Sequence, residues 1–110
     1  MRVLIGGREV TKTTVVANTF FKRFAGLMGR KGMPPDEGML FYDCGSIHCF
    51  FMKFTIDVVY ISRDMKVVGT ETIKPWRVGK IFKGAKHTLE LCEGKAEGLE
   101  AGMTVEITNN

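Results

Sequence analysis

The sequence predicts a mostly β (α+β) fold, in which a small antiparallel sheet curls into a barrel or packs as a sandwich. Three observations predict it. Short runs rich in β-branched and aromatic residues recur along the chain, glycine and proline separate these runs, and apolar residues follow helical spacing in only two places. The 110 residues match the usual size of one domain and contain no linker or repeat, so we expect a single domain over residues 1–110.

The predicted strands begin at the N-terminus with a hairpin. Gly6 and Gly7 supply the positive φ angles of a tight turn, so residues 3–5 should pair with residues 8–16. The same reasoning predicts further extended segments at residues 38–42, 51–61, 67–73, 80–82, 88–92 and 104–107. In the segment 88–92, alternation predicts that Thr88 and Glu90 point to solvent and that the leucines between them face the core.

Two segments have the spacing of amphipathic helices. Residues 19–28 place apolar side chains on one face, and a second, shorter helix is predicted near residues 95–101, with Gly102 as its stop. The apolar face of the first helix consists of Phe20, Phe24, Leu27 and Met28. Residues 30–37 contain glycine and two prolines and should form an exposed loop.

Composition limits the class of protein. Hydrophobic residues make up 45% of the chain and charged residues 25%, which is typical of folded proteins rather than disordered ones. Three cysteines leave at least one thiol unpaired, which argues against a secreted disulfide scaffold. No segment has the length of a signal-peptide core or a membrane span, so we expect a cytoplasmic protein without a membrane span.

A metal site must be considered at Cys44, His48 and Cys49, because all three residue types bind zinc. Their spacing lacks the paired two-residue gap of zinc ribbons, and a fourth ligand would have to come from Asp43, His87 or Cys92. A Cys49 nucleophile activated by His48 is also disfavoured, since neighbours on a strand point to opposite faces. We therefore expect three reduced, buried cysteines, with no metal and no cofactor.

The candidate ligand-binding residues are His48, Lys53, Asp57 and Trp76. Charges inside an apolar strand must be solvated or paired, and Lys53 and Asp57 share one face of the segment 51–61, so they could line a polar groove. An indole flanked by cations, as Trp76 is, can stack on a flat ligand. The alternative is structural: Asp57 accepts backbone N–H bonds near the start of the strand, and Lys53 lies at its rim.

Three segments carry a family resemblance: residues 19–28 (TFFKRFAGLM), 37–41 (EGMLF) and 48–61 (HCFFMKFTIDVVYI). With Leu89–Leu91, Gly94, Gly102 and Val105 they cover nearly the whole chain. The sequence resembles the domain of unknown function 192 family, also called uncharacterised protein family 0127. The resemblance implies a compact β-rich fold of about this length and implies no established activity or fixed metal-ligand set.

The favoured function is a non-enzymatic module that binds a small anionic or zwitterionic molecule, because the candidate groove carries both signs of charge. One alternative is an enzyme in which Asp57 or His48 is the general base and Lys53 positions an anionic substrate. Another is RNA or DNA binding through the basic residues of segments 23–31 and 77–86, which predicts affinity that falls steeply with salt. Oligomeric state is left open by the sequence.

Overall fold

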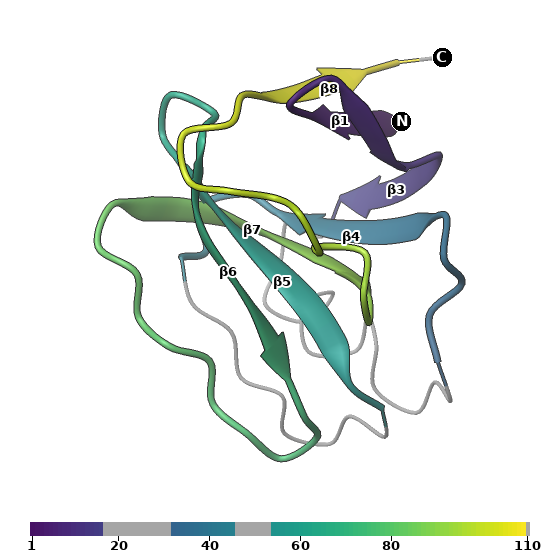
Figure 1. Cartoon of the computed structure of the whole chain (residues 1–110), viewed down its shortest axis with the longest axis vertical. Coiled ribbons are helices and arrows are strands. Elements are labelled where there is room, and N and C mark those ends of the chain that lie inside the picture. The colour runs from purple at the N-terminus through teal and green to yellow at the C-terminus, as the bar shows by residue number, and fades with distance from the viewer. Residues whose placement is uncertain (17–31, 46–53, 110) are drawn as a thin grey trace.

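The computed structural model describes residues 1–16, 32–45 and 54–109, in which eight β-strands form two sheets (Figure 1). The strands are β1 (Arg2–Ile5), β2 (Arg8–Thr11), β3 (Thr13–Val16), β4 (Glu37–Phe41), β5 (Ile56–Ser62), β6 (Val67–Ile73), β7 (Ala85–Cys92) and β8 (Val105–Thr108). A three-stranded sheet has the order β2-β1-β8 and a five-stranded sheet the order β3-β4-β7-β5-β6. The mostly β prediction is confirmed, but neither sheet closes into a barrel within the described residues.

The N-terminal hairpin is confirmed. Gly6 and Gly7 have φ angles of 60° and 83°, which turn β1 back into the antiparallel strand β2. The predicted partner strand 8–16, however, is wrong, because these residues form two strands in different sheets. The second of them, β3, pairs in parallel with β4, so the five-stranded sheet is not wholly antiparallel.

Backbone hydrogen bonds fix the point at which the chain changes sheet. The N–H groups of Lys12 and Thr13 both donate to the carbonyl of Asp36, at 2.8 and 3.1 Å. The hydroxyls of Thr11 and Thr14, both buried, bond to each other at 2.6 Å. The hydroxyl pair satisfies two buried polar groups, and the bonds to Asp36 mark the point where β2 ends and β3 begins.

Apolar residues cover both faces of the five-stranded sheet. The first core, between the two sheets, contains Val3, Ile5 and Val10 of the small sheet and Leu40, Val59, Ile61, Leu89 and Leu91 of the large one. The second core, on the opposite face, contains Met39, Phe41, Ile56, Val58, Tyr60 and Ile73. The central strands β7 and β5 are therefore buried on both sides.

This double burial corrects the expected orientation of Thr88 and Glu90. Both were predicted to point to solvent, yet their exposed fractions are 0% and 5%. Thr88 lies beside Phe41 in the register of β7 with β4, and Glu90 lies beside Met39, so both belong to the face of the second core. Alternation correctly separates the two faces of a strand, but it does not show whether the second face meets water.

The helix predicted near residues 95–101 is wrong. The segment forms successive turns, in which the N–H of Glu97 donates to the carbonyl of Gly94 at 3.2 Å and the N–H of Leu99 donates to that of Ala96 at 3.0 Å. Gly94 and Gly98 have φ angles of 93° and 85°, which a right-handed helix cannot contain. No described segment is a helix long and apolar enough to cross a membrane.

Two other expectations concern residues that the structure describes in part or not at all. The predicted helix 19–28 lies outside the described residues. Within the predicted loop 30–37, Gly32 and residues 34–36 are exposed, but Met33 is buried in the second core. The Met33 side chain thus packs the loop against the sheet.

Gly69 leaves room for an aromatic stack. Phe82 packs on Tyr60 with ring centroids 4.4 Å apart, and a methyl group added at Gly69 would overlap the Phe82 ring. We expect Gly69→Ala to displace this ring and lower the free energy of unfolding by about 2 kcal/mol, as measured by urea denaturation. The control is Gly32→Ala, which has open space around the new methyl group. Equal losses in the two variants would contradict the steric explanation.

Candidate functional site

Asp57 is a buried carboxylate that holds a loop against the sheet. It lies on β5, is 3% exposed, and accepts a hydrogen bond from the Thr72 hydroxyl of β6 at 2.7 Å. Its other oxygen accepts bonds from the backbone N–H groups of Gly94 and Ala96, at 3.0 and 2.9 Å. Charge-assisted bonds of this kind offset the cost of burying a carboxylate. These contacts match the structural alternative for Asp57, in which it accepts backbone N–H bonds.

The cavity beside Asp57 is acidic. It measures about 380 Å³, and it is lined by Asp57, Thr70, Glu71, Thr72, Glu93, Gly94, Ala96 and Glu97. Four of these residues are carboxylates, and none of the described lining residues is Lys or Arg. An anionic ligand would therefore be repelled here.

The other predicted site residues cannot all be compared with Asp57. His48 and Lys53 lie outside the described residues. Trp76 is 61% exposed in the segment between β6 and β7 and does not line the cavity at Asp57. A groove that unites all four residues thus stays a prediction.

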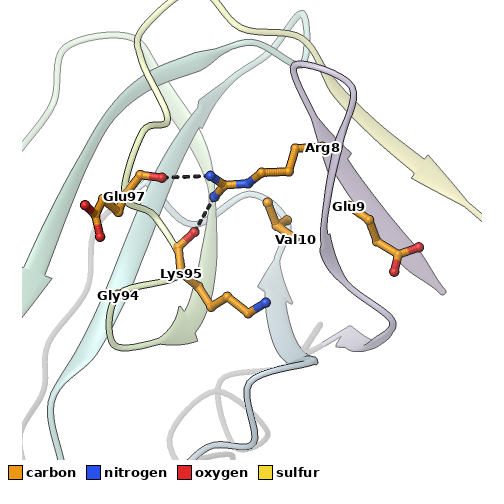
Figure 2. Close-up of a pocket in the computed structure, with 6 residues that line it drawn as sticks. All are labelled: Arg8, Glu9, Val10, Gly94, Lys95 and Glu97. Carbon is orange, nitrogen blue, oxygen red and sulfur yellow. Dashed lines mark hydrogen bonds between the residues drawn. The ribbon is translucent and has the colours of Figure 1, made fainter.

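A second cavity of about 530 Å³ adjoins the same turn segment (Figure 2). It is lined by Arg8, Glu9, Val10, Gly94, Lys95 and Glu97, and it shares Gly94 and Glu97 with the acidic cavity. Both signs of charge are present in this lining. The cavity forms where the N-terminal hairpin meets the turns that Asp57 holds in place.

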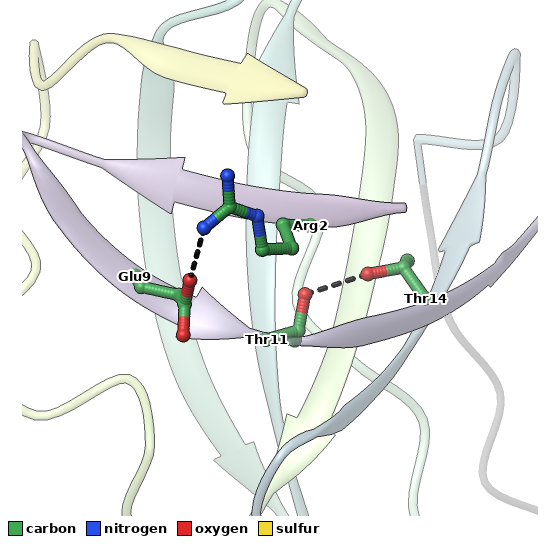
Figure 3. Close-up of polar contacts among 4 residues, drawn as sticks. All are labelled: Arg2, Glu9, Thr11 and Thr14. Carbon is green, nitrogen blue, oxygen red and sulfur yellow. Dashed lines mark hydrogen bonds and ion pairs between the residues drawn. The ribbon is translucent and has the colours of Figure 1, made fainter. Parts of the chain in front are cut away.

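Arg8 is the distinctive group of this second cavity. Its guanidinium donates hydrogen bonds to the backbone carbonyls of Lys95 at 2.5 Å and Glu97 at 2.8 Å. Figure 2 shows the carboxylates of Glu9 and Glu97 pointing away from the guanidinium. Within the described residues Arg8 forms no ion pair, whereas Glu9 pairs with Arg2 at 3.1 Å on the other side of the hairpin (Figure 3). The carbonyls therefore orient the guanidinium without neutralising its charge.

No pattern in the sequence indicated a role for Arg8. Its carbonyl partners lie 87 and 89 positions away along the chain, so no local pattern connects them. In the sequence Arg8 is simply the first residue of a hairpin strand.

Glu90 is a second residue whose chemistry the sequence did not indicate. It is buried between Met39 of β4 and Val58 of β5, and no described residue donates a hydrogen bond to it. Burial disfavours the charged form and raises the pKa of this carboxyl to about 8. Glu90 is therefore mostly protonated at neutral pH.

His87 has a structural environment. Its Nδ1 accepts the backbone N–H of Asp43 at 3.0 Å, and its ring meets that of Tyr42 edge-on at 5.2 Å. Burial lowers the pKa of His87. Because Nδ1 accepts the Asp43 N–H, the proton of the ring must be on Nε2. His87 is thus held as a neutral imidazole.

The cysteines that the structure describes are not grouped with metal-binding partners. Cys92 is a free thiol near a strand end, and Cys44 packs against the second core. Among the described residues, no three His, Cys, Asp or Glu side chains come close enough to share a metal ion. Cys49 lies outside these residues, so its predicted state stays a prediction.

Comparison with known proteins places the chain in a family. The model of the DUF192 family (Uncharacterized ACR) matches residues 1–107. The UPF0127 protein of Thermococcus sibiricus is 35% identical over 108 residues, covering 92% of this chain and 68% of that protein. The UPF0127 protein of Pyrococcus furiosus is 33% identical over 108 residues, covering 91% and 90%.

Two solved structures share the fold. A protein of unknown function from Novosphingobium aromaticivorans superposes with a TM-score of 0.82 at 22% identity, covering 97% of this chain and 84% of that one. A putative transcription regulator from Sinorhizobium meliloti gives a TM-score of 0.75 at 25% identity, covering 96% and 91%. The resemblance found in the sequence is confirmed: the chain belongs to the DUF192 family, whose curated relatives are named UPF0127.

Proposed function

We propose that this chain is a non-enzymatic module that binds a small anionic or zwitterionic molecule, whose carboxylate or phosphate group contacts Arg8 in the cavity of about 530 Å³. One observation carries the proposal. Two backbone carbonyls fix the direction of the Arg8 guanidinium, and no described carboxylate pairs with it. A pre-oriented, unneutralised guanidinium is suited to recognise a planar carboxylate or a phosphate.

The rest of the lining supports this ligand class. Lys95 adds a second cation to the cavity, and Glu97 also lines it, so its carboxylate could accept an ammonium group. The volume is in the range of small-molecule sites in general. The expected ligand class is thus the one predicted from the sequence, but its anionic group is assigned to Arg8 instead of Lys53.

The enzyme alternative has less support. A general base needs a lone pair directed at the substrate, and the Asp57 carboxylate already accepts three hydrogen bonds from the protein. His48, the other candidate base, lies outside the described residues. The proposed module requires no metal or cofactor.

Calorimetric titration with inorganic phosphate, succinate and glutamate tests the proposal. We expect at least one of them to bind, with affinity reduced about tenfold or more in Arg8→Gln, because a charge-assisted bond contributes about 1.5 to 3 kcal/mol. Lys95→Gln should weaken binding less and leaves the backbone contacts of Arg8 in place. Preference for glutamate over succinate would indicate a zwitterionic ligand.

The matched control is Arg63→Gln, which removes an exposed arginine that does not line the cavity. Thermal denaturation of each variant without ligand separates lost affinity from lost folding. Failure of all three compounds to bind, or equal affinities in Arg8→Gln and Arg63→Gln, would overturn the proposal.

A further inference from the structure

The positive charge of the chain is concentrated in residues 74–84, which connect β6 to β7. Four of the 16 Lys and Arg residues lie there, namely Lys74, Arg77, Lys80 and Lys83, and none of the 12 Asp and Glu residues does. The segment therefore carries a charge of +4, which is the whole net charge, because the other 12 Lys and Arg residues balance the 12 Asp and Glu residues. This segment, the basic connection, is a local electrostatic feature rather than part of a generally basic surface.

The basic connection also exposes large apolar side chains. Trp76, Val78 and Ile81 are 61%, 56% and 89% exposed, and the described residues contain only one other exposed large hydrophobic residue, Val15 at 48%. These three side chains lie within six residues of one another in the chain, and exposed apolar side chains that lie together generally mark an interaction site. Their positions alternate with the cations along the segment.

Contacts with the sheet hold the basic connection in place. It runs along the outside of β6, the edge strand of the five-stranded sheet (Figure 1). Phe82 packs on Tyr60 of β5, and the backbone N–H of Lys80 donates to the Glu71 carboxylate at 2.7 Å. The same carboxylate oxygen accepts the Tyr60 hydroxyl at 2.7 Å. Phe82 is thus turned inward, while Trp76 and Ile81 remain on the outside.

We propose that the basic connection docks on an anionic phospholipid surface. Trp76, Val78 and Ile81 enter the boundary between headgroups and acyl chains, and the interleaved lysines and Arg77 contact lipid phosphates. Tryptophan is favoured at that boundary, and basic residues next to an anionic leaflet add to the attraction. Binding of this kind leaves the protein peripheral, with no segment crossing the bilayer.

The apolar side chains favour lipid over nucleic acid. Single-stranded nucleic acid binds to cationic grooves through aromatic side chains that stack on bases, and the aliphatic chains of Val78 and Ile81 offer no such face. These two side chains are 56% and 89% exposed, and transfer of their apolar surface from water into an apolar medium is favourable. The docking surface is separate from the Arg8 cavity, because none of its residues lines that cavity.

Co-sedimentation with vesicles tests this proposal. The chain should sediment with vesicles of phosphatidylcholine mixed with phosphatidylserine and much less with phosphatidylcholine alone, and high salt should release it. Trp76 is the only tryptophan, so its fluorescence emission reports directly on the docking surface and should shift to shorter wavelength on binding.

Two pairs of variants and two controls sharpen the result. Each of two double variants should lower the vesicle partition coefficient about tenfold. One combines Val78→Ser with Ile81→Ser, and the other combines Lys80→Gln with Lys83→Gln. Val15→Ser and Arg63→Gln alter exposed residues elsewhere and should leave it unchanged. All six side chains are exposed, so melting temperatures should stay close to that of the parent chain.

Three outcomes would overturn the proposal. They are no sedimentation with phosphatidylserine vesicles, equal loss in the control variants, and binding to a single-stranded oligonucleotide that is stronger than binding to vesicles and insensitive to the Val78 and Ile81 changes. The last outcome would assign the surface to nucleic acid.

Discussion

Glu90→Gln is expected to stabilise the protein above pH 8 by as much as about 5 kcal/mol. The carboxyl has a pKa of about 8 when folded and 4.5 as its ordinary value, and each pH unit of difference corresponds to about 1.4 kcal/mol. Between these values the folded state binds more protons than the unfolded state, so stability falls as pH rises and then levels off above pH 8. The amide cannot ionise and should remove this slope.

Urea denaturation at intervals from pH 4 to pH 9 measures this effect. The parent chain and Glu90→Gln should have similar stability near pH 4 and should separate as the pH rises. Glu106→Gln, at an exposed position of β8, is the matched control and should follow the parent chain. Parallel curves for the parent chain and Glu90→Gln would contradict the assignment of a protonated carboxyl.

Asp57→Ala is expected to lower the free energy of unfolding by about 4 kcal/mol. The change leaves the N–H groups of Gly94 and Ala96 without their acceptor and removes the bond from Thr72. Asp57→Asn keeps the shape and one acceptor, so a loss of about 1 to 2 kcal/mol is expected. Thr72→Val removes a single bond at a position exposed to solvent and should cost less again.

Hydrogen exchange at the amides of Gly94 and Ala96 distinguishes the roles of Asp57. If Asp57 is structural, exchange at both amides accelerates in Asp57→Asn, and binding of phosphate or succinate falls only in proportion to the folded fraction. Unchanged exchange together with lost binding would show instead that Asp57 contacts the ligand.

Local sequence patterns were sufficient to predict the first hairpin and several strands, because these elements depend on residues close together in the chain. The paired glycines at positions 6 and 7 made the first hairpin predictable, since few other residues adopt positive φ. The strands near residues 38–42, 67–73 and 104–107 followed from β-branched and aromatic runs and are confirmed as β4, β6 and β8. The family was also readable from its motifs, which cover almost the whole chain.

Local patterns failed where the same pattern of residues is compatible with two different structures. The segment 95–101 has helical spacing of Ala96 and Leu99, but glycines at 94 and 98 adopt positive φ and the two apolar side chains reach the first core from turns. The break within residues 8–16 likewise depends on the Asp36 carbonyl, which comes from the segment before β4 and lies beside the chain where β3 and β4 pair.

The sequence by itself determined the mostly β class, the turns and the family, because these depend on backbone preferences and on residues close together in the chain. Tertiary structure decided the chemistry of the candidate sites. Glu90 acquires its raised pKa only because a second core covers its face of β7, and Arg8 is oriented by carbonyls nearly the whole chain away. Burial and long-range hydrogen bonds are properties of the packed chain, so no local pattern contains them.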